Sequence, residues 1–119
     1  KIVDFHSEAS AEKRAMGFWL DGRVSAVFGT HTHVMTADAQ ILPKGTAYIS
    51  DLGMTGPKQS VLGVKPEISI EWLRTGMPAR FDTAEGECIR DRCIMNGCIF
   101  EFDNKTGKAI SVEPVIIEG

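Results

Sequence analysis

Hydrophobic residues in the first 30 positions form two short runs separated by a more polar segment. Residues 1–5 and 24–28 are largely apolar and short, which predicts two mostly buried β-strands. The segment between them is long enough for a crossover helix. A strand, a helix and a second strand in this order predict a βαβ unit with parallel strands.

The segment between the two runs has the spacing of an amphipathic helix. Ser7 or Ser10 can cap its start, and Asp21-Gly22 stops it after about Leu20. Its expected core face carries four residues at helical spacing: Ala11, Ala15, Phe18 and Trp19.

The pattern in the rest of the chain predicts a hairpin, a second helix and, toward the C-terminal end, antiparallel strands. Pro43-Lys44-Gly45 is a turn between two short strands, and Pro66 opens a helix that ends before Gly76. A glycine-rich loop is expected over residues 51–57. Further strands are expected near residues 80–82, 94–102 and 109–117, with a hairpin turn at 103–107. We find no repeat or linker, so residues 1–119 are expected to form one piece without an internal domain boundary.

Composition is that of an ordinary globular protein, with 43% hydrophobic and 24% charged residues in 119. A net charge of -3 argues against a surface that wraps nucleic acid, so an anionic substrate would be small. No run approaches the roughly 18 apolar residues of a membrane span, and no signal peptide is visible. We therefore expect no membrane partner and a cytoplasmic location. The chain opens directly into a strand without an initiating methionine, which suggests that sheet partners are encoded upstream.

Three cysteines are spaced regularly, with four residues between neighbours: Cys88, Cys93 and Cys98. This spacing matches neither zinc sites nor the usual iron–sulfur motifs. Because free cysteine behaves as a small hydrophobic residue, we expect these three to be buried, reduced and structural.

All three histidines fall at the ends of the two predicted parallel strands. His6 ends the first apolar run, and His31 and His33 follow the second. In open α/β sheets ligands bind outside the carboxyl ends of the strands, where these side chains would meet. Imidazole is the commonest metal ligand, so the sequence predicts a metal site, suited to zinc or, with added carboxylates, to iron or manganese. Partners for the second ring nitrogens could be Asp4, Asp38, Asp51 or backbone carbonyls, and the sequence leaves that choice open.

Several segments together resemble the YmdB-type bacterial metallophosphoesterases of the calcineurin-like superfamily. They are Val3 to Lys13 (VDFHSEASAEK), Leu20 to Val27 (LDGRVSAV), Gly29 to Val34 (GTHTHV), Thr36-Ala37-Asp38, and Gly53 to Pro57 (GMTGP). The resemblance runs over essentially the whole chain, includes the turn at 103–107 and preserves the 25-residue separation of His6 and His31.

This resemblance implies that the chain is the C-terminal half of a single metallophosphoesterase domain, an α/β fold with a four-layer αββα sandwich. It implies a dinuclear metal centre that hydrolyses phosphodiesters, including cyclic nucleotides. By motif position, His6 and His31 would ligate one ion and His33 the other. The two ions would be divalent, iron or manganese in the first place and zinc as a further possibility.

The resemblance also shows which parts of the site this chain lacks. In the family, the N-terminal half supplies an aspartate, a bridging glutamate, an asparagine and the histidine thought to protonate the leaving group. None of these motifs occurs here, so this chain is expected to contribute no catalytic acid or base and to need the missing half, or self-association as a homo-oligomer. The loop at 53–57 could offer backbone N–H groups of Thr55 and Gly56 to a substrate phosphate, or simply form a tight turn.

Two other classes of function remain open at this point. An amidohydrolase also places a His-x-His pair at the end of a strand, but it needs a full (β/α)₈ barrel, against which the predicted hairpins argue. Alternatively, the chain is a catalytically incompetent metal-binding fragment or assembly module, with histidines that only stabilise its structure.

Overall fold

The computed structural model describes residues 1–84 and 92–119. These residues form two compact units, which we describe separately. Unit 1 comprises Lys1–Gly53 with Asn96–Val115, and unit 2 comprises Met54–Met95 with Ile116–Gly119. The expectation that all 119 residues belong to one domain remains a prediction.

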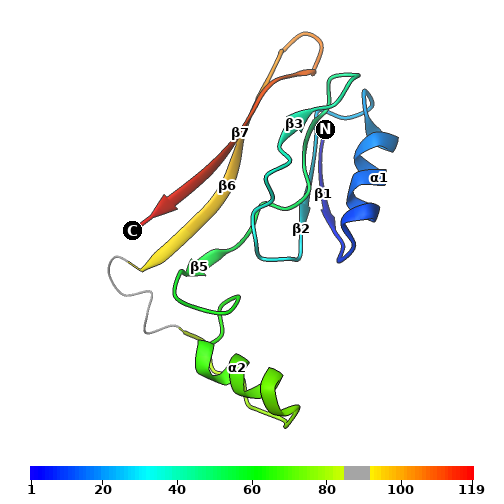
Figure 1. Ribbon diagram of the computed structural model, residues 1–119. Helices are drawn as coiled ribbons and strands as arrows, with labels where there is room; N and C mark the ends of the chain where they lie inside the picture. The colour runs from blue at the N-terminus through cyan, green and yellow to red at the C-terminus, as the bar shows by residue number, and fades with distance from the viewer. Residues whose placement is uncertain (85–91) are drawn as a thin grey trace. The chain divides into compact units, whose positions relative to one another are not determined.

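Unit 1 contains a four-stranded sheet in the order β1-β2-β4-β3. Strands β1 (Ile2–His6), β2 (Ala26–Thr30) and β4 (Ala47–Ile49) run parallel to one another. Strand β3 (Gln40–Ile41) pairs antiparallel with β4. Helix α1 (Ser10–Leu20) connects β1 to β2 (Figure 1). The predicted βαβ unit and the predicted hairpin are therefore both confirmed.

The capping prediction for α1 is wrong at its start and right at its end. The N-cap residue is Ala9, which offers no side-chain hydrogen bond. The Ser7 hydroxyl instead donates to the Glu12 carboxylate, so it ties the residues before the helix to its first turn without capping it. At the other end Asp21 is the C-cap residue, as expected.

The predicted core face of α1 is also wrong, because the side chains expected inside are exposed. Trp19 is 63% exposed and Phe18 is 50% exposed. The face that meets the sheet carries Lys13, Met16, Gly17 and Leu20. A Cβ atom on Gly17 would lie 2.5 Å from the Tyr48 ring, so glycine is what lets the helix approach the sheet.

The core of unit 1 lies between α1 and one face of the sheet. Val27, Leu42 and Tyr48 form its centre, and partly buried hydrophobic side chains pack around them. On the opposite face, Phe28 stacks on Phe100 with ring centroids 6.2 Å apart. Neighbouring side chains of a strand point to opposite faces, so β2 contributes Val27 to one layer and Phe28 to the other.

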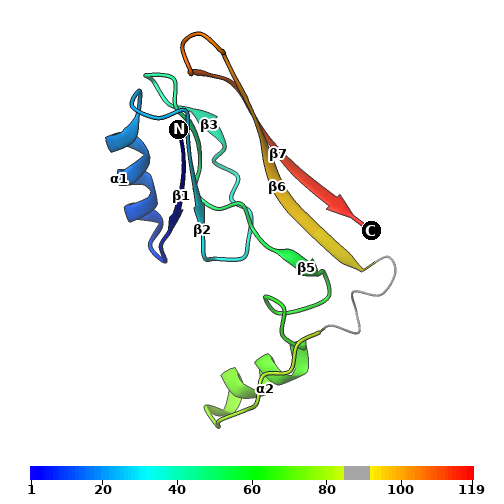
Figure 2. The same cartoon turned by 180° about the vertical axis from the view of Figure 1, so that it is seen from behind.

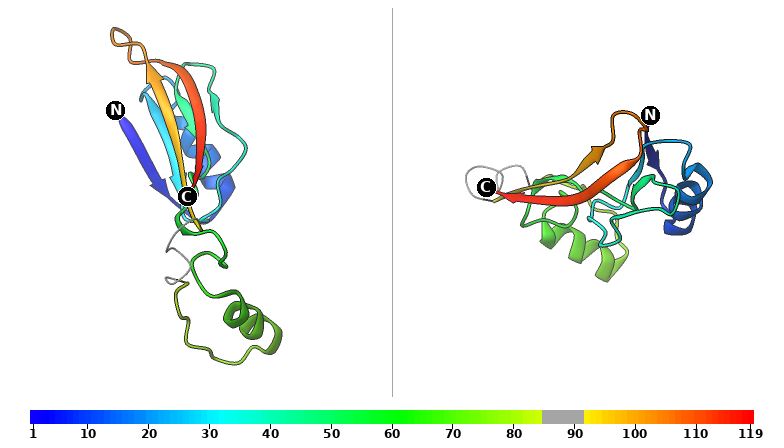
Figure 3. Two further views of the ribbon diagram at one scale, coloured as in Figure 1. Left: turned by 90° about the vertical axis from the view of Figure 1, so that its left-hand side faces the viewer. Right: turned by 90° about the horizontal axis from the view of Figure 1, so that it is seen from above.

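Phe100 belongs to a long antiparallel hairpin of β6 (Cys93–Phe102) and β7 (Ala109–Glu118), drawn from behind in Figure 2 and from two further sides in Figure 3. Its turn is where the sequence predicts it. The Asp103 carboxylate accepts hydrogen bonds from the N–H groups of Lys105 and Thr106, which fixes this turn.

Unit 2 contains β5 (Thr55–Pro57), which pairs antiparallel with the first residues of β6, and helix α2 (Pro66–Thr75). Gly76 ends α2 in the left-handed conformation, as predicted. Two other expectations are wrong. Residues 55–57 form a strand because they hydrogen-bond to β6, and residues 80–82 form none because the only pairing nearby, among the described residues, is a single bridge from Thr83 to Val64.

Cys93 and Cys98 are half-buried thiols, and burial raises the pKa of Cys98. The prediction of structural cysteines is therefore met only in part, since neither is fully buried. Cys88 lies outside the described residues. Among the helices that the structure describes, none is long and apolar enough to cross a membrane.

Candidate metal centre

The carboxyl ends of β1 and β2 bring two of the three histidines together. His6, the last residue of β1, pairs in register with Thr30, the last residue of β2. His31 follows directly, and its Nδ1 lies 3.1 Å from Nε2 of His6. The two rings meet edge to face, with centroids 5.0 Å apart. Two imidazole nitrogens thus face each other at the edge of the sheet where the sequence predicts a metal.

The spacing of these nitrogens fits a shared metal ion. Metal–imidazole bonds of about 2.0–2.1 Å, at angles between a right angle and the tetrahedral angle, place two ligating nitrogens about 2.8–3.4 Å apart. The observed 3.1 Å, at which the two rings share a hydrogen bond, also falls within this interval. His6 and His31 are both exposed, so an ion could reach them from solvent.

A chain of hydrogen bonds orients the His6 ring. Nδ1 of His6 lies 3.0 Å from the Thr30 hydroxyl, which donates to the Asp4 carboxylate at 2.9 Å. Because the hydroxyl proton is used on Asp4, Thr30 accepts from the Nδ1–H of His6. The lone pair of His6 is then on Nε2, the nitrogen that faces His31. Of the three aspartates left open by the sequence, Asp4 is the one connected to a histidine ring, and it acts through Thr30, which no sequence pattern singled out.

Asp51 and Asp38 have other roles at the same end of the sheet. Asp51 is buried and accepts hydrogen bonds from the Lys13 amine and from the N–H groups of Thr32 and Gly53. Burial alone would raise the pKa of Asp51, but these hydrogen bonds outweigh it and lower the pKa below 3.8. Asp38 accepts hydrogen bonds from Ser50 and from the Thr36 hydroxyl, and the same hydroxyl accepts from the Asp51 N–H.

His33 does not join the other two histidines in the described part of the chain. Its side chain is exposed, and its backbone has a φ of 64°. Across residues 1–84 and 92–119, no three His, Cys, Asp or Glu side chains lie close enough together to hold a metal ion. His6 and His31 are thus a pair of candidate ligands, and the role of His33 as a ligand of a second ion remains a prediction.

A cavity of about 650 Å³ lies beside His6, between the end of β1 and helix α1. Trp19 and Met16 line it from the helix, and Phe5 and His6 line it from the strand. Helical spacing predicts Trp19 in the core, whereas the structure makes it an aromatic wall next to the candidate metal centre.

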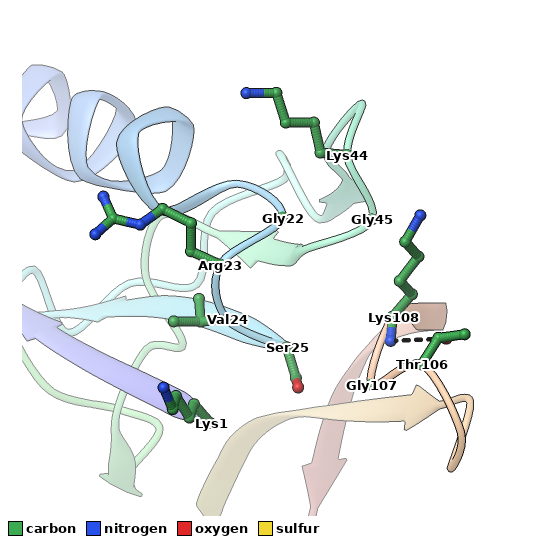
Figure 4. A pocket seen from close by; sticks show the side chains of 10 residues that line it. All are labelled: Lys1, Gly22, Arg23, Val24, Ser25, Lys44, Gly45, Thr106, Gly107 and Lys108. Atoms are coloured by element: carbon green, nitrogen blue, oxygen red, sulfur yellow. Dashed lines mark hydrogen bonds between the residues drawn. The ribbon is translucent and has the colours of Figure 1, made fainter.

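A second pocket, of about 130 Å³, lies at the amino ends of the same strands (Figure 4). Basic residues line it, namely Lys1, Arg23, Lys44 and Lys108. The amines of Lys44 and Lys108 and the guanidinium of Arg23 do not point toward a common centre, and Arg23 lies over the Trp19 ring, 4.4 Å from its centroid. This pocket contains none of the predicted site residues.

Thr55 and Gly56, the predicted contacts to a substrate phosphate, belong to unit 2. They lie in β5, where Thr55 is exposed and Gly56 is half-buried. Their role remains a prediction, because the histidines belong to unit 1.

The fold and the histidine pair together define a βαβ unit with a candidate metal site at the carboxyl edge of its parallel strands. A comparison with known protein families specifies the class further. The chain belongs to the YmdB-like protein family, whose model matches residues 1–115.

Proteins similar to this chain include a 2',3'-cyclic-nucleotide 2'-phosphodiesterase of Bacillus subtilis, which is 50% identical over 116 residues. The matched region covers 98% of this chain and 42% of that protein. A solved structure of a novel phosphatase from Mycoplasma pneumoniae superposes with a TM-score of 0.88 at 44% identity, over 98% of this chain and 40% of that one. A hypothetical protein from Thermus thermophilus superposes with a TM-score of 0.87 at 40% identity, over 98% and 44% of the two chains. The chain therefore spans less than half the length of these relatives.

Proposed function

We propose that this chain supplies the histidine ligands of a dinuclear metal centre in a phosphodiesterase that acts on small phosphoesters such as cyclic nucleotides. The observation that carries the proposal is the 3.1 Å approach of His6 Nε2 to His31 Nδ1 at the carboxyl ends of two parallel strands. The name of the Bacillus subtilis relative, which is 50% identical, supports the substrate class.

In this proposal His6 and His31 ligate one ion and His33 ligates the other. Iron and manganese suit a site that mixes imidazoles with carboxylates, and zinc is the further candidate. When bound, two such cations would neutralise charge on the phosphate and lower the pKa of a bridging water. The role of Asp4 and Thr30 is to hold the Nε2 lone pair of His6 toward the ion.

The remaining ligands and the proton donor would come from the part of the protein that corresponds to the unmatched length of its relatives. Exposed apolar side chains in unit 1 support such a partner, because Ile2 on β1 is 58% exposed and Phe18 and Trp19 on α1 are at least half exposed. We propose that this part completes a four-layer αββα sandwich in which the present chain is the C-terminal half.

The test is hydrolysis of 2',3'-cyclic AMP by the intact protein loaded with Mn²⁺ or Fe²⁺. Cleavage of the P–O2' bond by water should give the 3'-monophosphate, and the His31→Ala variant should not produce it. The 119-residue chain alone should bind metal incompletely, and it should not hydrolyse the cyclic nucleotide until the other half of the domain is added. Metal-dependent hydrolysis by the purified chain alone, or unchanged hydrolysis by the His31→Ala variant, would contradict the proposal.

A further inference from the structure

The loop that carries His31 and His33 has a strained backbone on both sides of Thr32. His31 has a φ of 131° and His33 a φ of 64°. In the described part of the chain, Leu62 is the only other non-glycine residue with positive φ. Residues in such conformations persist only where their surroundings hold them, and they concentrate at functional sites. The surroundings of Thr32 therefore decide where the two imidazoles lie.

A buried carboxylate holds the centre of this loop. The Thr32 N–H donates to Oδ2 of Asp51 at 2.9 Å, and the Lys13 amine donates to the same oxygen at 2.7 Å. Oδ1 of Asp51 accepts from the Gly53 N–H at 2.9 Å. Lys13 and Asp51 are 2% and 1% exposed, so the ion pair lies in the protein interior.

The backbone around Lys13 and Asp51 leaves room for the two side chains to meet. Lys13 reaches Asp51 from α1 by crossing Gly29, where an added Cβ would lie 2.8 Å from Cδ of Lys13 and 1.8 Å from the Ser50 carbonyl oxygen. Asp51 is itself fixed, because its N–H donates to the Thr36 hydroxyl and its carbonyl accepts from the Thr36 N–H. Helix α1, the loop after β2 and the segment after β4 thus converge on one ion pair.

A buried ion pair adds little stability over apolar residues of similar size, so stability alone does not explain Lys13 and Asp51. We propose that the pair is a positioning device. Asp51 holds the strained His31-Thr32-His33 backbone so that the His31 ring faces His6, and Lys13 holds the Asp51 carboxylate in place. This inference rests on the proposed metal centre, since it assigns the pair a role in preparing that centre to bind an ion.

The test uses Co²⁺ as the probe and two uncharged variants of the intact protein. The apolar variant, Lys13→Met with Asp51→Leu, leaves no buried charge and no acceptor for the Thr32 N–H. The amide variant, Lys13→Gln with Asp51→Asn, also leaves no charge and keeps one carbonyl oxygen, which can accept from Thr32, while its NH2 group replaces the oxygen that accepts from Gly53. Equilibrium dialysis and the visible absorption spectrum of bound Co²⁺ report the site without any assay of activity, and near-ultraviolet circular dichroism reports the fold.

Outer partners of metal ligands typically change affinity about 10- to 100-fold when they are removed. We expect the folded apolar variant to lose about 10- to 100-fold in Co²⁺ affinity and to show an altered absorption spectrum. The Co²⁺ affinity of the amide variant should stay within about 3-fold of the parent's. Parent affinity and spectrum in the folded apolar variant would overturn the proposal. If only the amide variant folds, a loss of about 10-fold or more in it would overturn the proposal instead.

The His6→Ala variant separates this inference from the proposed function. If the parent and the His6→Ala variant bind Co²⁺ equally, the metal centre itself is wrong. If His6→Ala loses an ion that the parent binds and the apolar variant does not weaken Co²⁺ binding, the metal centre stands and only the positioning role fails.

Discussion

The two ends of the parallel strands in unit 1 place different residue types at positive φ. At the amino end and in the turn beside it, positive φ angles fall on glycines: Gly22 at 78°, Gly45 at 100° and Gly107 at 71°. At the carboxyl end they fall also on His31 at 131° and His33 at 64°. Glycine adopts these angles at little steric cost, whereas a residue with a side chain is destabilised by about 1–3 kcal/mol.

The difference indicates that the fold accepts strained, less stable backbone conformations at the end of the sheet that carries the candidate metal centre. The amino end is closed by relaxed turns, and the basic side chains around its pocket point outward (Figure 4). The carboxyl end combines strained histidines, a buried ion pair and two imidazole nitrogens in contact. In unit 1, the residues with side chains that adopt positive φ are therefore the two histidines at the candidate metal centre.

The largest effect should come from removing a ligand at the carboxyl end. In the intact protein His31→Ala should abolish metal binding at the His6–His31 pair and lower phosphodiester hydrolysis by about 10³-fold or more, because the metal supplies several kcal/mol of transition-state stabilisation. Metal content by mass spectrometry and the hydrolysis rate measure both effects. Lys44→Ala, a matched change at the amino end, should alter neither. If the two substitutions had equal effects, the proposed functional difference between the amino and carboxyl ends of the strands would be contradicted.

A smaller effect is expected from Gly29→Ala, which tests the close packing under the histidine loop. Its Cβ would lie 1.8 Å from the Ser50 carbonyl oxygen, so the backbone of β2 or of the residues after β4 must move. We expect a loss of about 3 kcal/mol or more in the free energy of unfolding, measured by urea denaturation. Gly97→Ala is the control, because nothing lies within 4 Å of a Cβ at Gly97. If both variants are equally stable, the close approach at Gly29 is wrong.

Thr30→Val should weaken metal binding less than His31→Ala does, and it should leave the stability of the fold nearly unchanged. Valine keeps the shape but removes the hydroxyl between His6 and Asp4, so the His6 ring loses its orientation. Metal affinity should fall about 10- to 100-fold, and Thr30→Ser should restore it because it retains the hydroxyl. Isothermal titration with Mn²⁺ measures both. A Thr30→Val variant that binds Mn²⁺ as tightly as the parent would show that the Asp4–Thr30–His6 chain has no role.

The smallest effect concerns acid stability and Asp38. Burial would raise the pKa of Asp38, but hydrogen bonds from Ser50 and Thr36 outweigh it and lower the pKa below 3.8. A carboxyl with a depressed pKa in the folded state stabilises the fold above its unfolded pKa, and this contribution is lost as the pH falls through the folded value. The stability difference between the parent and Asp38→Asn should therefore shrink on going from about pH 6 to about pH 3. A difference that stays constant in urea denaturation over this range would contradict the assignment.

The parts of the fold that follow from local patterns were predictable from the sequence. The βαβ unit, the hairpin around Pro43-Lys44-Gly45, the turn at 103–107 and the end of α2 at Gly76 rest on hydrophobic runs and turn residues, and the structure confirms each. The placement of His6 beside His31 follows from the same patterns, since parallel strands bring their carboxyl ends to one edge.

Features that depend on packing between distant residues could not be predicted from the sequence. Helical spacing favours Phe18 and Trp19 as the buried face of α1, but the sheet accepts Gly17 and Lys13 because Tyr48 fills the space over the glycine and Asp51 neutralises the lysine. No local pattern marks a lysine as buried. Thr30 and the Lys13–Asp51 pair were missed for the same reason, because their partners are 24 or more residues away in the chain.

The central claim is that His6 and His31 bind one ion. Crystals of the intact protein grown with Mn²⁺ and measured at the manganese absorption edge test it directly. An anomalous difference peak about 2.0–2.3 Å from both Nε2 of His6 and Nδ1 of His31 is the predicted result. Metal peaks that are all remote from this pair, in crystals where the two imidazoles are ordered, would contradict it.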